Sequence, residues 1–489
     1  MAAGSDSCHP TGRTRGAPKP GFLVRQAASR DSRGAGSEPR VRDLSLELAA
    51  EEPGADTKRF GTFLGVFTPS ILTILGAIMY RRFGWVVGHT GLWGTVAVVL
   101  AAHVISITTG LSVASIATNR AVKTGGNYYI ISRSLGLSIG GTIGTALYLA
   151  LALGVSLYLI AFGEAFLEAF PQYAPFGLSE ATKVANIRVV GTAACVVLSA
   201  LTLYSTSIAL KSQILVLIAI GLSLVSIVFG DSTGEVGTAI PTNFSLPENR
   251  DDLGTVFAVF FPAVTGFTAG VGMSGDLKDP KRAIPLGTVG AILVGMVIYL
   301  LLPWVFVARE VPVEVLQDPA RYGILNEIAW RPELVMAGVA AATISSALGS
   351  ILGAPRTLQA LALDGVAPRW MGRGKEEPRV ALVITILIAE AGILIGDLEV
   401  VGRVITMFFL TCYGALCLAC GLERWASPDF RPQFRVPIWV SLLGAVASFL
   451  VMSQISFGFM TVAIVLMALL YLSIRRGQPR LGVGDTWGG

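Results

Sequence analysis

About twelve apolar stretches, each long enough to cross a lipid bilayer, dominate this sequence. A membrane helix needs ~20 mostly apolar residues, and spanning segments must satisfy their own backbone polar groups. Only 14% of the 489 residues are charged, whereas soluble proteins carry about 25%. We therefore predict an all-α membrane protein with about twelve transmembrane helices, at residues 62–84, 91–117, 139–168, 187–208, 212–230, 253–275, 284–308, 334–353, 380–396, 400–421, 436–454 and 456–474.

Lys and Arg are concentrated in alternate loops, and this bias predicts the orientation of the chain. The polar residues 1–57 are expected to form a disordered cytoplasmic tail, followed by a membrane domain at 58–475 and a short cytoplasmic tail at 476–489. Both termini are therefore expected inside the plasma membrane, or inside the inner membrane of a bacterial cell. Arg81 and Arg82 lie at the outer end of the first segment, where they are expected to snorkel to the interface.

Two apolar segments contain residues that interrupt a membrane helix. The first has Gly76 within Thr73–Ile78, and the second has Pro262 and Gly266 within Pro262–Thr268. Paired interruptions in the two halves of a chain indicate a transporter's binding site. The freed backbone groups cannot face lipid, so we expect them to face a ligand. A helix start after Gly76 suits an anion, and freed carbonyls suit a cation.

Acidic residues are absent from the middle of the first, third, sixth and eighth segments. Such a site must bind cations through neutral oxygens, which favours binding a cation and an anion together. Glu390 in the ninth segment is a less favoured candidate for proton coupling. Cys417 and Cys420 lack a second Cys/His pair, so no metal cofactor is expected. No nucleic-acid partner is implied. These residue types alone leave inorganic ions and amino acids as alternative substrates.

The loops 118–136 and 355–379 are either re-entrant or interfacial elements, or simple linkers.

The segments around both interruptions also carry long motifs in a fixed order. Over residues 58–475 the chain resembles the cation-chloride cotransporter family of the amino acid–polyamine–organocation superfamily. The motifs that carry the resemblance are Arg82–Gly91, Thr109–Ser112, Gly125–Gly136, Phe260–Gly266, Ser274–Pro280, Ala283–Thr288, Ser345–Leu348 and Gly353–Arg356.

The resemblance implies a five-plus-five inverted repeat with helices one and six broken. Its halves would be residues 62–230 and 253–421, with extra helices at 436–474 that are expected to form a homodimer contact. It also implies binding sites for potassium at Thr73, Ile74, Tyr158, Pro262 and Thr265; for chloride at Gly76, Ala77 and Ile78 and at Gly266, Phe267, Thr268 and Tyr413; and for sodium at Leu72, Leu75, Ala342, Ser345 and Ser346.

The resulting prediction is a secondary active transporter and not an enzyme. It would carry chloride with potassium and sodium in an electroneutral symport, by alternating access between the two sides of the bilayer. One alternative is an amino-acid or polyamine permease of the same fold. A second alternative is a membrane protein that transports nothing itself and modulates a cotransporter.

Overall fold

The computed structural model describes residues 60–119, 126–177, 179–204, 212–272, 277–374 and 378–477. The regular secondary structure of these residues is helical, and an isolated bridge between Phe60 and Leu277 is their one β-type contact. The predicted all-α fold is confirmed. The predicted N-terminal tail 1–57 and residues 478–489 lie outside the described residues.

Every predicted transmembrane stretch overlaps a helix or a pair of half-helices. Nine helices of the described residues are long and apolar enough to cross a membrane, so the count of about twelve and the inverted repeat remain predictions. The α-helices and half-helices that fall on the predicted segments are α2 (Thr68–Ile74), α3 (Ala77–Arg81), α4 (Phe83–Asn119), α6 (Leu137–Ala169), α7 (Glu180–Tyr204), α9 (Gln213–Val228), α10 (Leu253–Phe260), α11 (Ala269–Gly272), α12 (Pro280–Ala308), α15 (Pro332–Leu363), α16 (Arg379–Ile395), α17 (Leu398–Ala426), α18 (Ile438–Ile455) and α19 (Phe457–Gly477). The short helices α13 (Val313–Gln317) and α14 (Ile324–Glu327) lie between α12 and α15.

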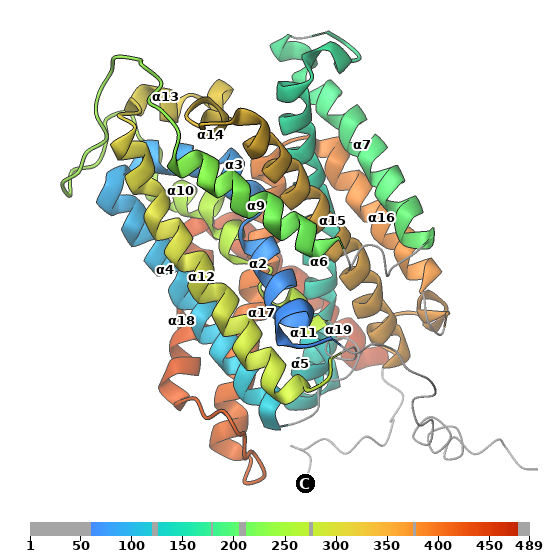
Figure 1. Cartoon of the computed structure of the whole chain (residues 1–489). Helices are drawn as coiled ribbons and strands as arrows, with labels where there is room; N and C mark the ends of the chain where they lie inside the picture. The colour runs from blue at the N-terminus through green and yellow to red at the C-terminus, as the bar shows by residue number, and fades with distance from the viewer. Residues whose placement is uncertain are drawn as a thin grey trace, which may run out of the picture. The chain divides into compact units, whose positions relative to one another are not determined.

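The interrupted segments lie inside the helix bundle. All residues of α2 are buried, and α2 packs against α9, α11, α12 and α15. Figure 1 shows α2 and α11 between α12 on one side and α6 and α15 on the other. Protein therefore surrounds the ends of the half-helices, as their unpaired backbone groups require.

Long helices form the frame around this centre. α6 packs against α7, α15, α16 and α17, and α4 packs against α12, α17 and α18. α18 and α19 are peripheral, and apolar side chains such as Val446 and Val462 are more than half exposed, as expected for residues that face lipid.

Two elements differ from the predicted segments. Within the loop 118–136, the described residues from Asn127 to Leu135 form the helix α5. α5 packs closely on α6, because a Cβ added at Gly144 would lie 2.3 Å from Cδ2 of Tyr128. The eighth segment was predicted to end at residue 353, but α15 continues through Pro355 to Leu363. Proline is tolerated in a membrane helix when neighbouring groups bond the freed backbone.

Candidate ion-binding site

The first membrane segment breaks between α2 and α3. Leu75 has φ −85° and ψ 46°, and Gly76 has φ −97° and ψ −150°, so neither residue is helical. The last backbone hydrogen bond of α2 runs from the Leu75 amide to the Ile71 carbonyl, at 2.9 Å. The predicted interruption of helix one therefore falls at Leu75–Gly76.

The sixth segment breaks after a short 3₁₀ turn at Phe261–Val264. Thr265 is extended, and Gly266 has a φ of 79°. A positive φ strongly favours glycine, because other L-residues are strained there. The predicted interruption of helix six is therefore present, and its direction depends on Gly266.

The two breaks touch each other. A Cβ added at Gly266 would lie 2.9 Å from Cβ of Thr73. The Ser70 hydroxyl of α2 donates to the Phe267 carbonyl in the unwound part of helix six, at 2.6 Å. Residues almost 200 positions apart in the sequence thus form one site, as the paired interruptions predicted.

Side-chain hydroxyls bond several of the carbonyl groups that unwinding frees. A buried carbonyl left without a partner costs about 1–3 kcal/mol, so these contacts stabilise the broken helices. The pairs, donor first, are Ser70 to Phe267, Ser106 to Val264 at 2.9 Å, Thr265 to Pro262 at 2.8 Å, Tyr299 to Ile74 at 2.8 Å and Ser346 to Leu72 at 3.4 Å.

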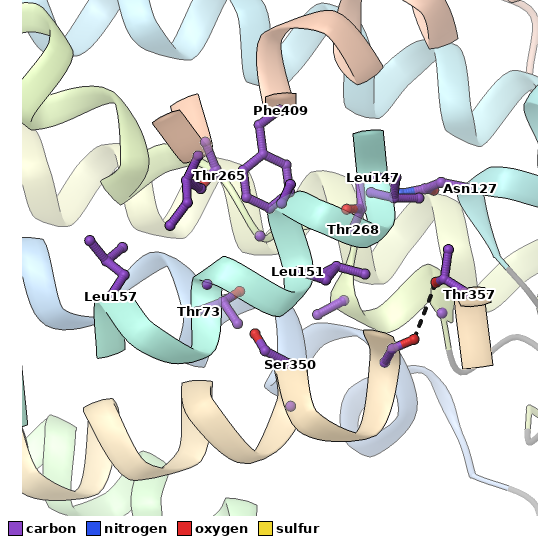
Figure 2. Close-up of a pocket in the computed structure, with 18 of the residues that line it drawn as sticks. Thr73, Asn127, Leu147, Leu151, Leu157, Thr265, Thr268, Ser350, Thr357 and Phe409 are labelled. Atoms are coloured by element: carbon purple, nitrogen blue, oxygen red, sulfur yellow. Dashed lines mark hydrogen bonds between the residues drawn. The ribbon is translucent and has the colours of Figure 1, made fainter. Parts of the chain in front are cut away.

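A pocket of about 80 Å³ lies beside the breaks. One water molecule needs about 10–15 Å³ by this measure, so several waters or ions fit. No Asp or Glu is among the described residues that line it (Figure 2). The lining residues are Thr73, Asn127, Leu147, Ala150, Leu151, Gly154, Leu157, Tyr158, Thr265, Gly266, Thr268, Ala269, Gly272, Gly349, Ser350, Gly353, Arg356, Thr357, Ile405 and Phe409.

The structure brings three of the five predicted potassium residues to this pocket. Thr73, Tyr158 and Thr265 line it from three different elements. Ile74 and Pro262 are not among the lining residues, and their carbonyls already accept bonds from Tyr299 and Thr265. Three residues of the set therefore line one pocket. The Thr73 hydroxyl donates to the Ser70 carbonyl and the Thr265 hydroxyl to the Pro262 carbonyl, each at 2.8 Å, which leaves the lone pairs of both oxygens available to a cation.

The predicted sodium residues are brought together in part. Leu72 and Leu75 flank the end of α2, and Ser346 of α15 donates to the Leu72 carbonyl at 3.4 Å. Ala342 is fully buried one turn before Ser346 on α15. Ser345 is half-buried, and the structure records no hydrogen bond of its hydroxyl within the described residues.

The predicted chloride residues form two groups. In the first, Gly76 precedes Ala77 and Ile78 at the buried start of α3. In the second, the Gly266 amide donates to the Tyr413 hydroxyl at 3.1 Å, and the rings of Phe267 and Tyr413 are 5.0 Å apart. Thr268 lines the pocket beside Gly266. The second group is thus assembled around Tyr413, whereas residues of the first do not line the pocket.

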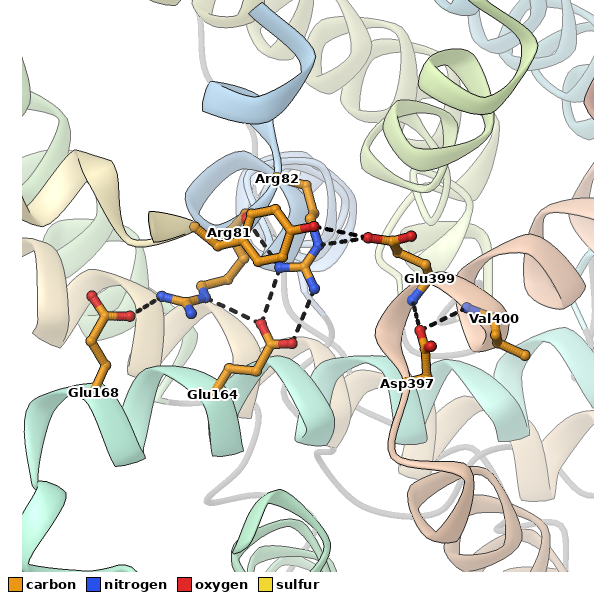
Figure 3. A network of polar contacts seen from close by, with 8 residues as sticks. Arg81, Arg82, Glu164, Glu168, Asp397, Glu399 and Val400 are labelled. Carbon is orange, nitrogen blue, oxygen red and sulfur yellow. Dashed lines mark hydrogen bonds and ion pairs between the residues drawn. The ribbon is translucent and has the colours of Figure 1, made fainter. Parts of the chain in front are cut away.

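Arg81 and Arg82 do not snorkel to the interface, contrary to the sequence-based expectation. Their side chains are only 8% and 3% exposed, and both contact Glu164 of α6 (Figure 3). Two Arg82 nitrogens donate to the two oxygens of Glu164, at 3.0 and 3.1 Å. Arg81 also pairs with Glu168. Burial is possible because each arginine finds a carboxylate.

The same network extends to α17 and to a loop. The Arg82 guanidinium lies 3.6 Å from the centre of the Tyr322 ring, and the Tyr322 hydroxyl donates to Glu399 at 3.0 Å. Burial, with Glu399 as a further cause, raises the pKa of Tyr322 above its ordinary value, so the hydroxyl stays protonated. Glu164 is six residues beyond the pocket residue Tyr158 on α6, about 9 Å along the helix. The network therefore lies beyond the Tyr158 end of the pocket.

A family model described as "Amino acid permease" matches residues 65–486, which is most of the chain. The chain belongs to the amino acid permease family. The proteins to which this permease is similar are membrane transport proteins and not enzymes, which agrees with the prediction.

Individual relatives place the chain more specifically within this family. The permease is 31% identical to "Solute carrier family 12 member 2" of Homo sapiens over 91% of this chain and 41% of the relative. It is 34% identical to "Solute carrier family 12 member 9" of Rattus norvegicus (89% and 52%). It is 32% identical to "Cation-chloride cotransporter 2" of Oryza sativa subsp. japonica (90% and 49%). The resemblance to cation-chloride cotransporters is confirmed, and this chain spans about half the length of these relatives or less.

Several lining residues of this permease were not among the predicted site residues. Ser350 follows Ser346 by four positions on α15, so the two share a helix face, and that spacing could have indicated it. Asn127 and Thr357 line the other end of the pocket (Figure 2). Their positions depend on how α5 and α15 pack, which no local pattern indicates.

Proposed function

We propose that this permease is a secondary active transporter that carries chloride together with potassium and sodium, in an electroneutral symport. The main support is the pocket at the two breaks, which hydroxyl groups line without a carboxylate from the described residues. Neutral oxygens can replace the water around a cation, but they leave its charge uncompensated. A co-bound anion supplies that compensation. The printed name of the rice relative, a cation-chloride cotransporter, supports transport of chloride together with a cation.

The proposed ligands combine the sequence-based set with the geometry. In this proposal potassium takes the central position, because the hydroxyl-bearing residues Thr73, Tyr158 and Thr265 line the same pocket. Sodium takes the position between α2 and α15, and chloride takes positions next to helix starts and to the Tyr413 hydroxyl. The groups are Thr73, Ile74, Tyr158, Pro262 and Thr265 for potassium; Leu72, Leu75, Ala342, Ser345 and Ser346 for sodium; and Gly76, Ala77, Ile78, Gly266, Phe267, Thr268 and Tyr413 for chloride.

Alternating access is the proposed mechanism. The pocket extends along α6 from Tyr158 to Leu147, about 16 Å at the helix rise. The Arg82–Glu164 pair lies beyond Tyr158 and would have to separate to open that end. With the Lys/Arg bias, this end faces the outside and both termini lie in the cytoplasm, in a plasma membrane or a bacterial inner membrane. A homodimer contact through α18 and α19 is part of the proposal.

Uptake of Rb⁺ into proteoliposomes that hold the purified protein tests the function. We expect uptake that needs both Na⁺ and Cl⁻. Tyr158→Phe should raise the half-saturating Rb⁺ concentration about tenfold, because loss of a group that supports a metal site typically lowers the affinity for the ion about 10–100-fold. Tyr148→Phe, which alters a buried tyrosine outside the pocket lining, is the matched control. Uptake that needs Cl⁻ and ignores Na⁺ would replace the proposal with a potassium-chloride carrier.

An amino-acid substrate is the second candidate, and the description of the matching family model favours it. A carboxylate can occupy an anion site and an ammonium can occupy a cation site. This candidate predicts that Cl⁻ is dispensable and that zwitterionic amino acids suppress Rb⁺ binding. The modulatory-partner alternative predicts that the purified protein alone carries neither Rb⁺ nor amino acids. Uptake of Rb⁺ and of a labelled amino-acid mixture, measured side by side, therefore separates all three candidates.

A further inference from the structure

Tyr299 of α12 belongs to none of the ligand sets named above, but its side chain contacts the broken end of helix one directly. Its side chain is fully buried, and its hydroxyl donates to the Ile74 carbonyl at 2.8 Å. Ile74 is the last residue of α2. In a continuous helix its carbonyl would accept from the amide four residues later, so Tyr299 replaces a bond that the break removes.

The tyrosine ring is itself held in place. It packs against Phe260 at 5.3 Å between ring centres and 89° between planes, and against Phe83 at 5.3 Å. Phe260 is the last residue of α10, directly before the 3₁₀ turn Phe261–Val264 that leads to the break in helix six. Tyr299 therefore contacts the unwound end of helix one with its hydroxyl and the end of the half-helix of segment six with its ring.

The same face of α12 fixes the Ile74 side chain. Gly295 precedes Tyr299 by four positions, so the two residues share a helix face. A Cβ added at Gly295 would lie 2.5 Å from Cγ2 of Ile74. α12 thus contacts both the side chain and the carbonyl of one residue, which leaves little freedom to the peptide that joins Ile74 to Leu75.

The carbonyl of Thr73, one residue before Ile74, differs in its hydrogen bonding. No hydrogen bond from the described residues reaches the Thr73 carbonyl, and Thr73 lines the pocket whereas Ile74 does not. Successive residues of a helix are rotated by about 100° around its axis, so the Thr73 carbonyl lies on a different side of the helix end from the Ile74 carbonyl that contacts α12. Holding the Ile74 carbonyl in place also fixes the position of its neighbour. The bond from Tyr299 therefore occupies the Ile74 carbonyl, while the Thr73 carbonyl remains available to a ligand.

We infer that Tyr299 is a positioning residue for the cation site, and that it makes the Thr73 carbonyl, rather than the Ile74 carbonyl, the main backbone ligand of the potassium-like ion. This inference rests on the proposed function. Groups behind the ligands of a metal ion commonly orient those ligands, and their loss costs about 10–100-fold in affinity. Tyr299 would act in this way without touching the ion.

Tyr299→Phe removes the donor and keeps the ring. In the Rb⁺ uptake assay we expect the half-saturating Rb⁺ concentration to rise about tenfold, with the half-saturating Cl⁻ concentration unchanged. Tyr148→Phe is the control, because it also removes one buried hydroxyl. Placing 4-aminophenylalanine at position 299 restores an N–H donor and should restore the wild-type Rb⁺ value.

Each other outcome overturns the inference. An unchanged Rb⁺ value for Tyr299→Phe would remove the positioning role, and parallel shifts for all ions would mean a general packing defect. The same holds if 4-aminophenylalanine behaves like phenylalanine. If Tyr299→Phe does not fold, 4-fluorophenylalanine fills the space of the hydroxyl without donating and gives the same test. Absence of Rb⁺ uptake in the wild-type protein would overturn the proposed function first, and the inference with it.

Discussion

Position 266 has two constraints that only glycine can meet together. Its φ of 79° lies in the left-handed region, and its α-carbon faces the Thr73 side chain so closely that a Cβ would lie 2.9 Å from it. The first constraint comes from the direction of the unwound chain and the second from contact between the two breaks. Glycine at this position therefore allows the breaks to touch, and contact between them is what forms the site.

Gly266→Ala should therefore weaken transport strongly. The left-handed conformation costs roughly 1–2 kcal/mol with a Cβ, and the contact with Thr73 adds to that cost. We expect Rb⁺ uptake at low Rb⁺ to fall at least about tenfold, since 1.4 kcal/mol is a factor of ten. Gly221→Ala is the control, because that helical glycine has no atom within 4 Å of an added Cβ. Equal uptake by both variants would contradict the role of Gly266.

Ser346 is the predicted sodium residue with the clearest contact to helix one. Its hydroxyl now donates to the Leu72 carbonyl, and the same oxygen could turn its lone pair toward a bound Na⁺. Ser346→Ala should raise the half-saturating Na⁺ concentration about tenfold, since loss of one ligand is comparable to a hydrogen bond of about 1–1.5 kcal/mol. Thr343→Ala is the control, because that hydroxyl bonds carbonyls within its own helix. A Na⁺ dependence that survives Ser346→Ala would exclude this sodium site.

At the scale of elements, the Arg–Glu network joins α3, α6 and α17 at one end of the pocket. Glu164 is shared by two buried arginines, whereas Glu168 is 39% exposed and contacts only one. Removing one partner of a buried ion pair leaves an uncompensated charge and costs about 3–5 kcal/mol. An exposed pair contributes about 0–1 kcal/mol. Glu164 and Glu168 therefore contribute differently to the stability of the fold, although they lie four residues apart on α6.

Glu164→Gln should lower the thermal stability of the purified protein much more than Glu168→Gln. The reason is that glutamine at position 164 leaves Arg81 and Arg82 close together and without a shared carboxylate. Thermal unfolding followed by the loss of monodisperse protein measures the difference. Equal unfolding temperatures for the two variants would mean that water already screens Glu164, in contrast to its burial in the structure.

The elements also show how much the sequence could predict. Hydropathy located the helices, and glycine and proline located both breaks, because these signals are local. The positions of Arg81 and Arg82 were misjudged, because their burial depends on Glu164, more than 80 positions away. The end of α15 was misjudged at Pro355, because proline bends a membrane helix without ending it. The residue set at the pocket came from a resemblance, and packing of α5 and α15 added Ser350, Asn127 and Thr357.

At the scale of the whole molecule, the central question is charge balance. Glu390 is the acidic residue within the apolar segments that the sequence offered for proton coupling, yet it bonds Thr192 of α7 and does not line the pocket. Arg356 is the one charged residue among the described lining residues. Moving an uncompensated charge across a membrane couples it to the voltage by about 2.3 kcal/mol per 100 mV. The described lining residues offer a cation no fixed negative charge, so in the proposed function mobile anions must balance the cations.

We therefore expect the complete cycle to be electroneutral. Rb⁺ uptake into proteoliposomes should not change when a proton gradient with a protonophore imposes an inside-negative voltage, because no net charge moves. Replacing Cl⁻ by gluconate should abolish uptake at every voltage. Uptake that rises with inside-negative voltage and persists in gluconate would show that cations move alone, as in a uniporter. Uptake that needs Cl⁻ but still responds to voltage would mean an unequal ratio of anions to cations, and would overturn electroneutrality while leaving cotransport intact.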